Sequence, residues 1–193
     1  MNFLKSYTAF ILAGGKSSRM GEDKGMVLFK GKEMVVWMIE LLKPHFKEVC
    51  IISNNPAYAK FNLPVHSDLI KNQGPLGGLY TGLTYSSTPW NLFLACDMPF
   101  MNMDIIQHLA AGLKEYDAVV PFQNEHPEPL CAFYNKSCLP VIENQLQNGD
   151  NKIQDFYKLV NSNYINIMGL YSSVQNPFHN INTKEELKNS ALQ

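Results

Sequence analysis

A glycine-rich segment with several basic side chains, residues 12–24, is the part of the sequence best suited to bind polyphosphate. It follows a short apolar run and contains Arg19, the single arginine of the chain, together with Lys24. Gly14 and Gly15 allow the backbone to approach a ligand closely and to turn its N–H groups toward it. We therefore expect this loop to hold the phosphates of a nucleotide.

Two widespread phosphate-binding motifs do not match this segment. Lys16 and Ser17 resemble the end of a Walker A loop, but Phe10 stands where that motif needs its first glycine. The dinucleotide fingerprint G-x-G-x-x-G is also absent. The alternative interpretation is an exposed turn that happens to be basic.

Asp97 is the second candidate for chemistry. It follows the apolar run Asn91–Cys96, and Pro99 prevents that run from continuing as a strand. One carboxylate together with substrate phosphates is the usual protein site for Mg²⁺. The alternative is a helix cap, although Asn102 or Asp104 is better placed for that role.

Three further segments carry polar groups with weaker signals. Asp68 precedes a glycine-rich turn, Glu128 stands between two prolines, and Asn180 and Asn182 alternate on an extended segment so that both point the same way. Asp68 is suited to contact a base or ribose, and the two amides to contact a polar ligand. Each has an ordinary alternative: a loop carboxylate, a turn, and a cap for the last helix at Thr183.

The pattern of apolar residues predicts the elements that position these groups. Strands are expected at residues 7–13, 48–53, 63–66, 91–96, 118–121 and 130–134, and helices at 33–42, 76–86, 103–113, 139–147, 151–159 and 183–190. Strand and helix alternate over about the first 120 residues, which is typical of an α/β domain with a mostly parallel sheet covered on both faces. Such sheets bind ligands at the carboxyl ends of their strands. A length of 193 residues without a linker favours one domain.

Composition narrows the class of protein. Sixteen basic residues balance seventeen acidic ones, so the net charge of -1 argues against a nucleic-acid binder. The four cysteines form no CxxC pair, which favours a reducing compartment. No apolar stretch approaches the roughly twenty residues needed to span a bilayer. We expect a cytoplasmic protein that contacts neither nucleic acid nor membrane.

The series of motifs resembles the molybdenum cofactor guanylyltransferases, a family of nucleotidyltransferases with a Rossmann-like, glycosyltransferase-A-type fold. The matching segments are residues 12–24, 74–78, 96–100, 128–134 and 180–187. The first segment alone marks only the superfamily, whereas the whole ordered series is more specific. The resemblance implies a single three-layer domain, residues 1–193, whose part 7–121 binds the nucleotide and whose part 122–193 binds the acceptor.

The resemblance also implies an activity: GTP and Mg²⁺ bind, the terminal phosphate of molybdopterin attacks the α-phosphorus, and pyrophosphate leaves. Transient contact with cofactor-handling proteins would be compatible with it. Asp97 would hold Mg²⁺, with catalytic roles for Arg19, Lys24 and Asp97. The implied nucleotide-binding residues are Leu12, Ala13, Gly14, Gly15, Lys24, Asn54, Asp68 and Asp97; a family asparagine aligns ambiguously with Ser53, Asn54 and Asn55, of which we select Asn54. On the acceptor side would be Lys152, Asn180 and Asn182.

One departure from the family pattern concerns the acceptor. Some family members carry an arginine where this chain has Lys152, which keeps the charge but loses the bidentate grip on a phosphate. The alternatives to a guanylyltransferase are a cytidylyltransferase for the same cofactor, a sugar-phosphate nucleotidyltransferase, and a non-catalytic nucleotide-binding protein. Base preference should depend on residues 12–15 and 74–78.

Overall fold

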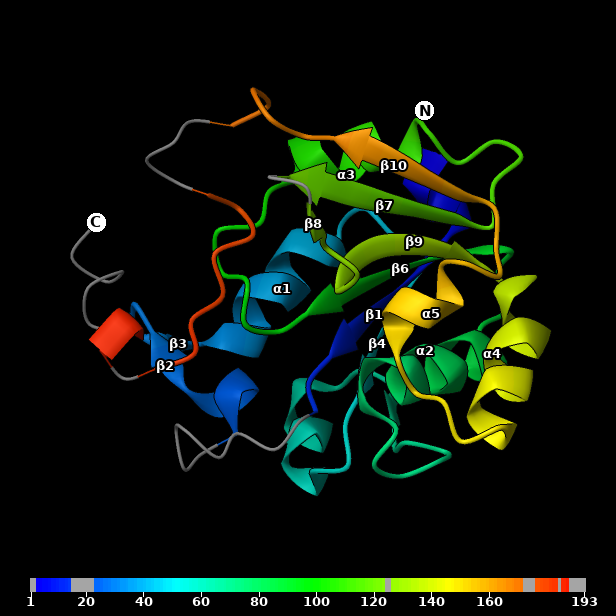
Figure 1. Ribbon diagram of the computed structural model, residues 1–193. Coiled ribbons are helices and arrows are strands. Elements are labelled where there is room, and N and C mark those ends of the chain that lie inside the picture. Colours follow the sequence, from blue (N-terminus) through cyan, green and yellow to red (C-terminus); the bar gives the residue numbers. More distant parts are fainter. Residues whose placement is uncertain (1–2, 15–22, 124–125, 172–175, 184, 188–193) are drawn as a thin grey trace.

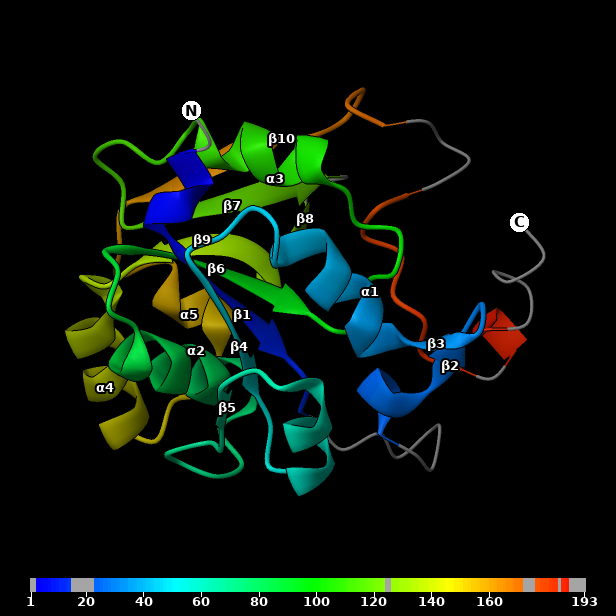
Figure 2. The same ribbon diagram turned by 180° about the vertical axis from the view of Figure 1, so that it is seen from behind.

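The architecture is a three-layer α/β domain, as predicted (Figures 1 and 2). The computed structural model describes residues 3–14, 23–123, 126–171, 176–183 and 185–187. Within these ranges, eight strands form one sheet, with β8 paired to β7 outside the main order β10-β7-β9-β6-β1-β4-β5. The strands are β1 (Thr8–Leu12), β4 (Glu48–Ile52), β5 (Val65–His66), β6 (Trp90–Ala95), β7 (Ala118–Gln123), β8 (His126–Pro127), β9 (Cys131–Asn135) and β10 (Ser162–Asn166). A separate two-stranded ribbon joins β2 (Leu28–Phe29) to β3 (Lys32–Glu33).

Helices cover both faces of this sheet, as the two opposite views show (Figures 1 and 2). One face packs against α1 (Met34–Leu42), α3 (Met103–Ala110) and the short 3₁₀ helix η1 (Phe3–Ser6). The other face packs against α2 (Gly74–Tyr85), α4 (Cys138–Gln147) and α5 (Ile153–Phe156). Two further 3₁₀ segments are η2 (Lys24–Met26) and η3 (Pro56–Phe61). No helix of the described residues is long and apolar enough to cross a bilayer.

The central strands are buried on both sides, which explains their continuous apolar sequence. In β1, Ile11 points into the core beneath α1 and α3, whereas Phe10 points into the core beneath α2 and α4. Phe93 of β6 lies beside Phe10 on the second face, with the two rings stacked at a centroid distance of 5.1 Å. This alternation fixes the register of β1 between β4 and β6, both of which run parallel to it.

The last third of the chain departs from the prediction. The expected helix over residues 151–159 is reduced to α5, and the sequence pattern did not reveal β10. β10 lies at the edge of the sheet with half-exposed residues such as Tyr164, so it lacks the apolar run that marks the central strands. β7 extends beyond the expected residue 121 to Gln123. Pro121 lacks an N–H, but its carbonyl still accepts from the N–H of Glu128 at 2.9 Å.

The predicted helix caps agree with the structure. The Asn102 side chain accepts from the N–H of Ile105 at 3.1 Å at the start of α3. At the last helix, Thr183 and Glu186 form the reciprocal capping box: each side chain accepts from the other residue's N–H at 3.1 Å. Residues 185–187 are helical, and the predicted continuation lies outside the described residues.

Gly82 of α2 is expected to be a sensitive packing position. A Cβ at Gly82 would lie 2.5 Å from one ring carbon of Phe93 and 3.1 Å from Phe10. Alanine favours a helix by up to about 1 kcal/mol over glycine, but the stacked rings cannot both move away. We expect Gly82→Ala to lower the free energy of unfolding by about 1–3 kcal/mol, measured by urea titration. Thr84→Ala, at an exposed position of the same helix, is the control; equal stability of the two variants would contradict this packing.

Candidate active site

The carboxyl ends of β4, β1 and β6 meet at one edge of the sheet and border a cavity of about 1090 Å³. The seven described residues predicted for nucleotide binding all line it: Leu12, Ala13, Gly14, Lys24, Asn54, Asp68 and Asp97. Further lining residues are Asp23, Ile52, Ser53, Asn55, Lys71, Asn72, Gln73, Gly74, Pro75, Gly78, Ala95, Cys96 and Leu130. Arg19 and Gly15 lie outside the described residues.

Lys24 and Asp97 form an ion pair in this cavity. Lys24 Nζ lies 3.0 Å from Asp97 Oδ2, and the two side chains are 26% and 12% exposed. The same Nζ donates to Asn182 Oδ1 at 2.5 Å. The backbone N–H of Ile181 donates to the Asp97 carbonyl at 3.0 Å, which fastens the C-terminal segment to the end of β6. Three distant parts of the sequence therefore meet at one ammonium group.

A second polar pair faces the cavity from β4 and β5. Asn54 Nδ2 donates to Asp68 Oδ2 at 2.7 Å, and the Asp68 N–H donates to Asn54 Oδ1 at 3.1 Å. These two hydrogen bonds fix the orientation of both side chains relative to each other. Ser53 and Asn55 also line the cavity, but Asn55 caps η3 by accepting from the Ala57 N–H at 3.0 Å.

The start of α2 closes the cavity on the side of Leu12. Gly74 has a φ of +58°, a conformation that suits glycine, and Pro75 follows at the start of the helix. A Cβ at Gly78 would lie 3.0 Å from Leu12 Cδ2. The two segments that we expect to choose the base therefore touch each other at the wall of the cavity.

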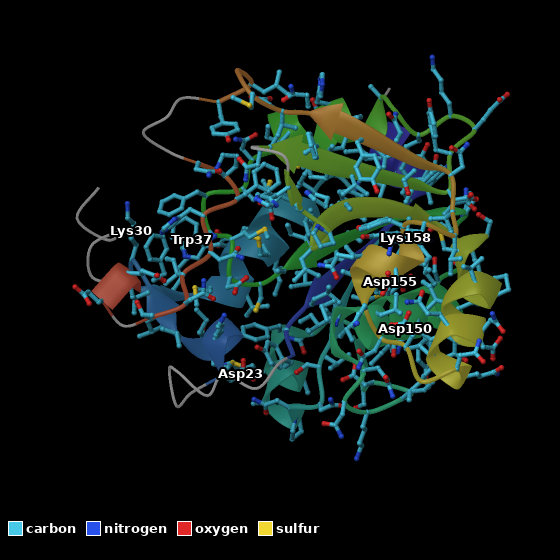
Figure 3. The ribbon with its side chains drawn as sticks, in the orientation of Figure 1. Asp23, Lys30, Trp37, Asp150, Asp155 and Lys158 are labelled. Carbon is cyan, nitrogen blue, oxygen red and sulfur yellow. The ribbon has the colours of Figure 1, made fainter. Side chains whose placement is uncertain are left out.

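The predicted acceptor residues are not all in one place. Asn182 contacts Lys24, as described above. Asn180 Oδ1 is buried and has no hydrogen-bond partner among the described residues. Lys152 is exposed, precedes α5 and is absent from the cavity lining. Its neighbours Asp150 and Asp155 lie well away from Asp23 in Figure 3.

Some lining residues have no role among the sequence-based predictions. Asp23 and Leu130 lie inside the matching segments 12–24 and 128–134, and Gln73 directly precedes the segment 74–78, but nothing in these segments distinguishes them from their neighbours. Leu130 is brought in by β9, which runs antiparallel to β6 and begins at this edge of the sheet. For Asp23, the available signals were its place in the segment 12–24 and its position directly before Lys24.

The donor atoms here suit a hard cation. No group of three or more His, Cys, Asp or Glu side chains that could hold a metal occurs in the described residues. Burial raises the pKa of the thiol of Cys96, the residue before Asp97. Asp97 supplies one carboxylate, which fits an ion such as Mg²⁺ that takes its other ligands from phosphates and water.

A mostly parallel sheet with a nucleotide-sized cavity and a lysine–carboxylate pair at the carboxyl ends of its strands fits the nucleotidyltransferases that the sequence resembles. The chain matches the family model for the MobA-like NTP transferase domain over residues 9–164. It is 37% identical over 185 residues to a probable molybdenum cofactor guanylyltransferase of Clostridium perfringens, covering 93% of each chain. It is 38% identical over 182 residues to the molybdenum cofactor guanylyltransferase of Vibrio parahaemolyticus, covering 92% of this chain and 91% of that one.

A solved structure agrees with these relatives. The molybdopterin-guanine dinucleotide biosynthesis protein A of Archaeoglobus fulgidus superposes with a TM-score of 0.82 at 26% identity, covering 96% of this chain and 97% of that one. The protein belongs to the molybdenum cofactor guanylyltransferase family of MobA-like NTP transferases.

Proposed function

We propose that the protein transfers GMP from GTP to the terminal phosphate of molybdopterin, releasing pyrophosphate and forming the guanine dinucleotide cofactor. The observation that carries this proposal is the Lys24–Asp97 pair in a cavity of nucleotide size, in a chain of this family. In such a transfer, positioning and charge neutralisation matter more than covalent chemistry with the protein. A lysine, a carboxylate that would hold the metal and a phosphate-binding loop are sufficient for such a transfer.

The nucleotide would lie along the edge formed by β4, β1 and β6. Leu12, Ala13 and Gly14 would face the guanine together with the start of α2. The Asn54–Asp68 pair would contact polar groups of the nucleotide, because both side chains line the cavity and hold each other in place. The triphosphate would follow the loop that carries Gly15 and Arg19.

The reacting phosphoryl group would lie near Lys24 and Asp97. Lys24 would neutralise the negative charge that develops on the phosphoryl oxygens, and Asp97 would hold Mg²⁺. When bound, Mg²⁺ would supply charge neutralisation for the phosphate oxygens and the leaving pyrophosphate.

The acceptor would approach from the part of the sheet formed by residues 122–193. β9, β7 and β10 lie on the far side of β6 from the nucleotide strands, and the segment with Asn180 and Asn182 crosses the end of β6. Asn180 Oδ1 is buried without a hydrogen-bond partner among the described residues, and its contact with the acceptor stays a prediction. Lys152 lies outside the cavity lining, and its role in acceptor binding stays a prediction, as does the cytoplasmic location.

The base preference is the most direct test of this proposal. We expect GTP to bind in a Mg²⁺-dependent manner and more tightly than CTP or UTP, measured by calorimetry with Mg²⁺ and then with EDTA. A preference for CTP or UTP would move the function to a cytidylyl or sugar-phosphate nucleotidyltransferase. GTP binding without pyrophosphate release on adding molybdopterin would favour a non-catalytic nucleotide-binding protein.

A further inference from the structure

Asp23 is a carboxylate at the edge of a cavity that we expect to bind polyphosphate. A negative charge there is unfavourable for phosphate binding, unless the carboxylate has a different role. Its two oxygens are engaged by three donors from the protein. Oδ1 accepts from the Tyr58 hydroxyl at 2.6 Å and from the Gly25 N–H at 3.1 Å, and Oδ2 accepts from Asn55 Nδ2 at 2.8 Å. These contacts direct the carboxylate toward the protein.

The three donors come from two separate segments. Gly25 belongs to η2, the turn that begins with Lys24, while Asn55 and Tyr58 belong to the β4–η3 corner. Asp23 is the N-cap of η2 and therefore fixes the backbone of the residue that follows it. Figure 3 labels Asp23 where η2 meets η3. The carboxylate thus joins the end of the first loop to the neighbouring strand.

Packing around Gly25 reinforces this connection. A Cβ at Gly25 would lie 2.2 Å from the Tyr58 hydroxyl oxygen and 3.3 Å from Cys96 Sγ. Tyr58 is fully buried, so its ring has little freedom to move aside. The turn η2 is therefore enclosed between Tyr58 and Cys96, the residue before Asp97. This close approach brings Lys24 to Asp97.

We propose that Asp23, held by Tyr58 and Asn55, is a positioning residue that sets the location of the Lys24 ammonium for nucleotidyl transfer. The network acts through Lys24: Asp23 lines the cavity, but the three protein donors hold its two oxygens toward η2 and η3. This inference rests on the proposed function for its kinetic readout. A misplacement of a catalytic group by about 1 Å can cost up to about a hundredfold in rate, so the loss of one hydroxyl should be visible.

Tyr58→Phe removes only the hydroxyl that holds Asp23. We expect kcat to fall about tenfold while the KM for GTP changes less than about twofold, since nucleotide contacts are retained. Pyrophosphate release measures both values, and the melting temperature measures the structural cost. The matched control is Tyr157→Phe, which removes a buried hydroxyl that contacts Tyr134 at 2.5 Å and lies outside the cavity lining. That control should lower the melting temperature and leave kcat unchanged.

A double-mutant cycle separates positioning from a general structural effect. In a Lys24→Ala background, Tyr58→Phe should cause no further fall in kcat, because the residue being positioned is absent. The full tenfold loss in that background would overturn the proposal, and so would a Tyr58→Phe enzyme with the wild-type kcat. If Tyr58→Phe does not fold, Asp23→Asn tests the same contacts with the same two readouts.

A structural readout keeps this inference separate from the proposed function. Gly25→Ala should lower the melting temperature by several degrees through the clash with the Tyr58 hydroxyl, and adding Tyr58→Phe should restore part of that loss. Additive effects would contradict the packing of η2. A wild-type protein that binds GTP but transfers nothing to molybdopterin would refute the proposed function alone. A wild-type protein that transfers GMP, with Tyr58→Phe equally active, would refute the positioning role alone.

Discussion

Asp97→Asn should lower kcat by at least about a hundredfold and leave the protein folded. Asparagine keeps the size of the side chain and an oxygen that can accept from Lys24, but it removes the charge that would hold Mg²⁺. The remaining amide oxygen is a weak ligand for a divalent cation that prefers carboxylates and phosphates. Pyrophosphate release at saturating GTP, molybdopterin and Mg²⁺ measures the loss.

The fold should survive this change because Asp97 contributes to the site more than to the core. Its ion pair with Lys24 is 3.0 Å long, and Lys24 keeps its contact with Asn182. We expect a stability loss of about 1–2 kcal/mol, from a pair that is still partly exposed. Asp104→Asn, an exposed carboxylate at the start of α3, is the control and should retain the wild-type rate. An Asp97→Asn enzyme with the wild-type rate at saturating Mg²⁺ would refute the metal assignment.

The sequence predicted that these residues would lie close together, for a simple geometric reason. Asp97 and the first loop each follow a buried strand, and β1 and β6 are neighbours running in the same direction. Parallel strands end at the same edge, so residues far apart in the sequence are brought together there. The prediction needed only the strand boundaries and the order of the central strands.

The sequence could not decide in the same way which of several adjacent residues contacts the nucleotide. Ser53, Asn54 and Asn55 all follow β4, and all three line the cavity. Their roles differ because of their hydrogen-bond partners, which a sequence pattern does not show. Asn54 pairs with Asp68, while Asn55 donates to Asp23. Nucleotide contact by Asn54 stays a prediction, but the structure shows why its side chain differs from its neighbours.

The C-terminal residues show a second limit. Alternation of Asn180 and Asn182 predicted a shared direction, and the resemblance placed both on the acceptor side. In the structure, Asn182 contacts Lys24, whereas the Oδ1 of Asn180 is buried without a partner among the described residues. Long-range docking of this segment on the Asp97 carbonyl decides their surroundings. That contact depends on the whole fold and leaves no local pattern.

Lys24→Ala should lower kcat about a hundredfold while weakening GTP binding by less than about tenfold. The ammonium would meet phosphoryl oxygens whose negative charge grows toward the transition state, so more of its interaction energy is gained there than in the bound ground state. Calorimetry gives the affinity for GTP with Mg²⁺, and pyrophosphate release gives kcat under the same conditions.

Removal of the Lys24 side chain should affect the site and leave the apolar core intact. Lys24 contacts the polar side chains of Asp97 and Asn182, so Lys24→Ala leaves the Asp97 carboxylate without its cation and should not create a cavity in the core. Lys60→Ala is the control, since Lys60 is an exposed lysine paired with Glu33 at 2.7 Å and does not line the cavity. Equal losses in kcat and affinity would make Lys24 a ground-state binding residue. In that case the positioning role proposed for Asp23 would fail as well, because that role requires the Lys24 ammonium to act on kcat.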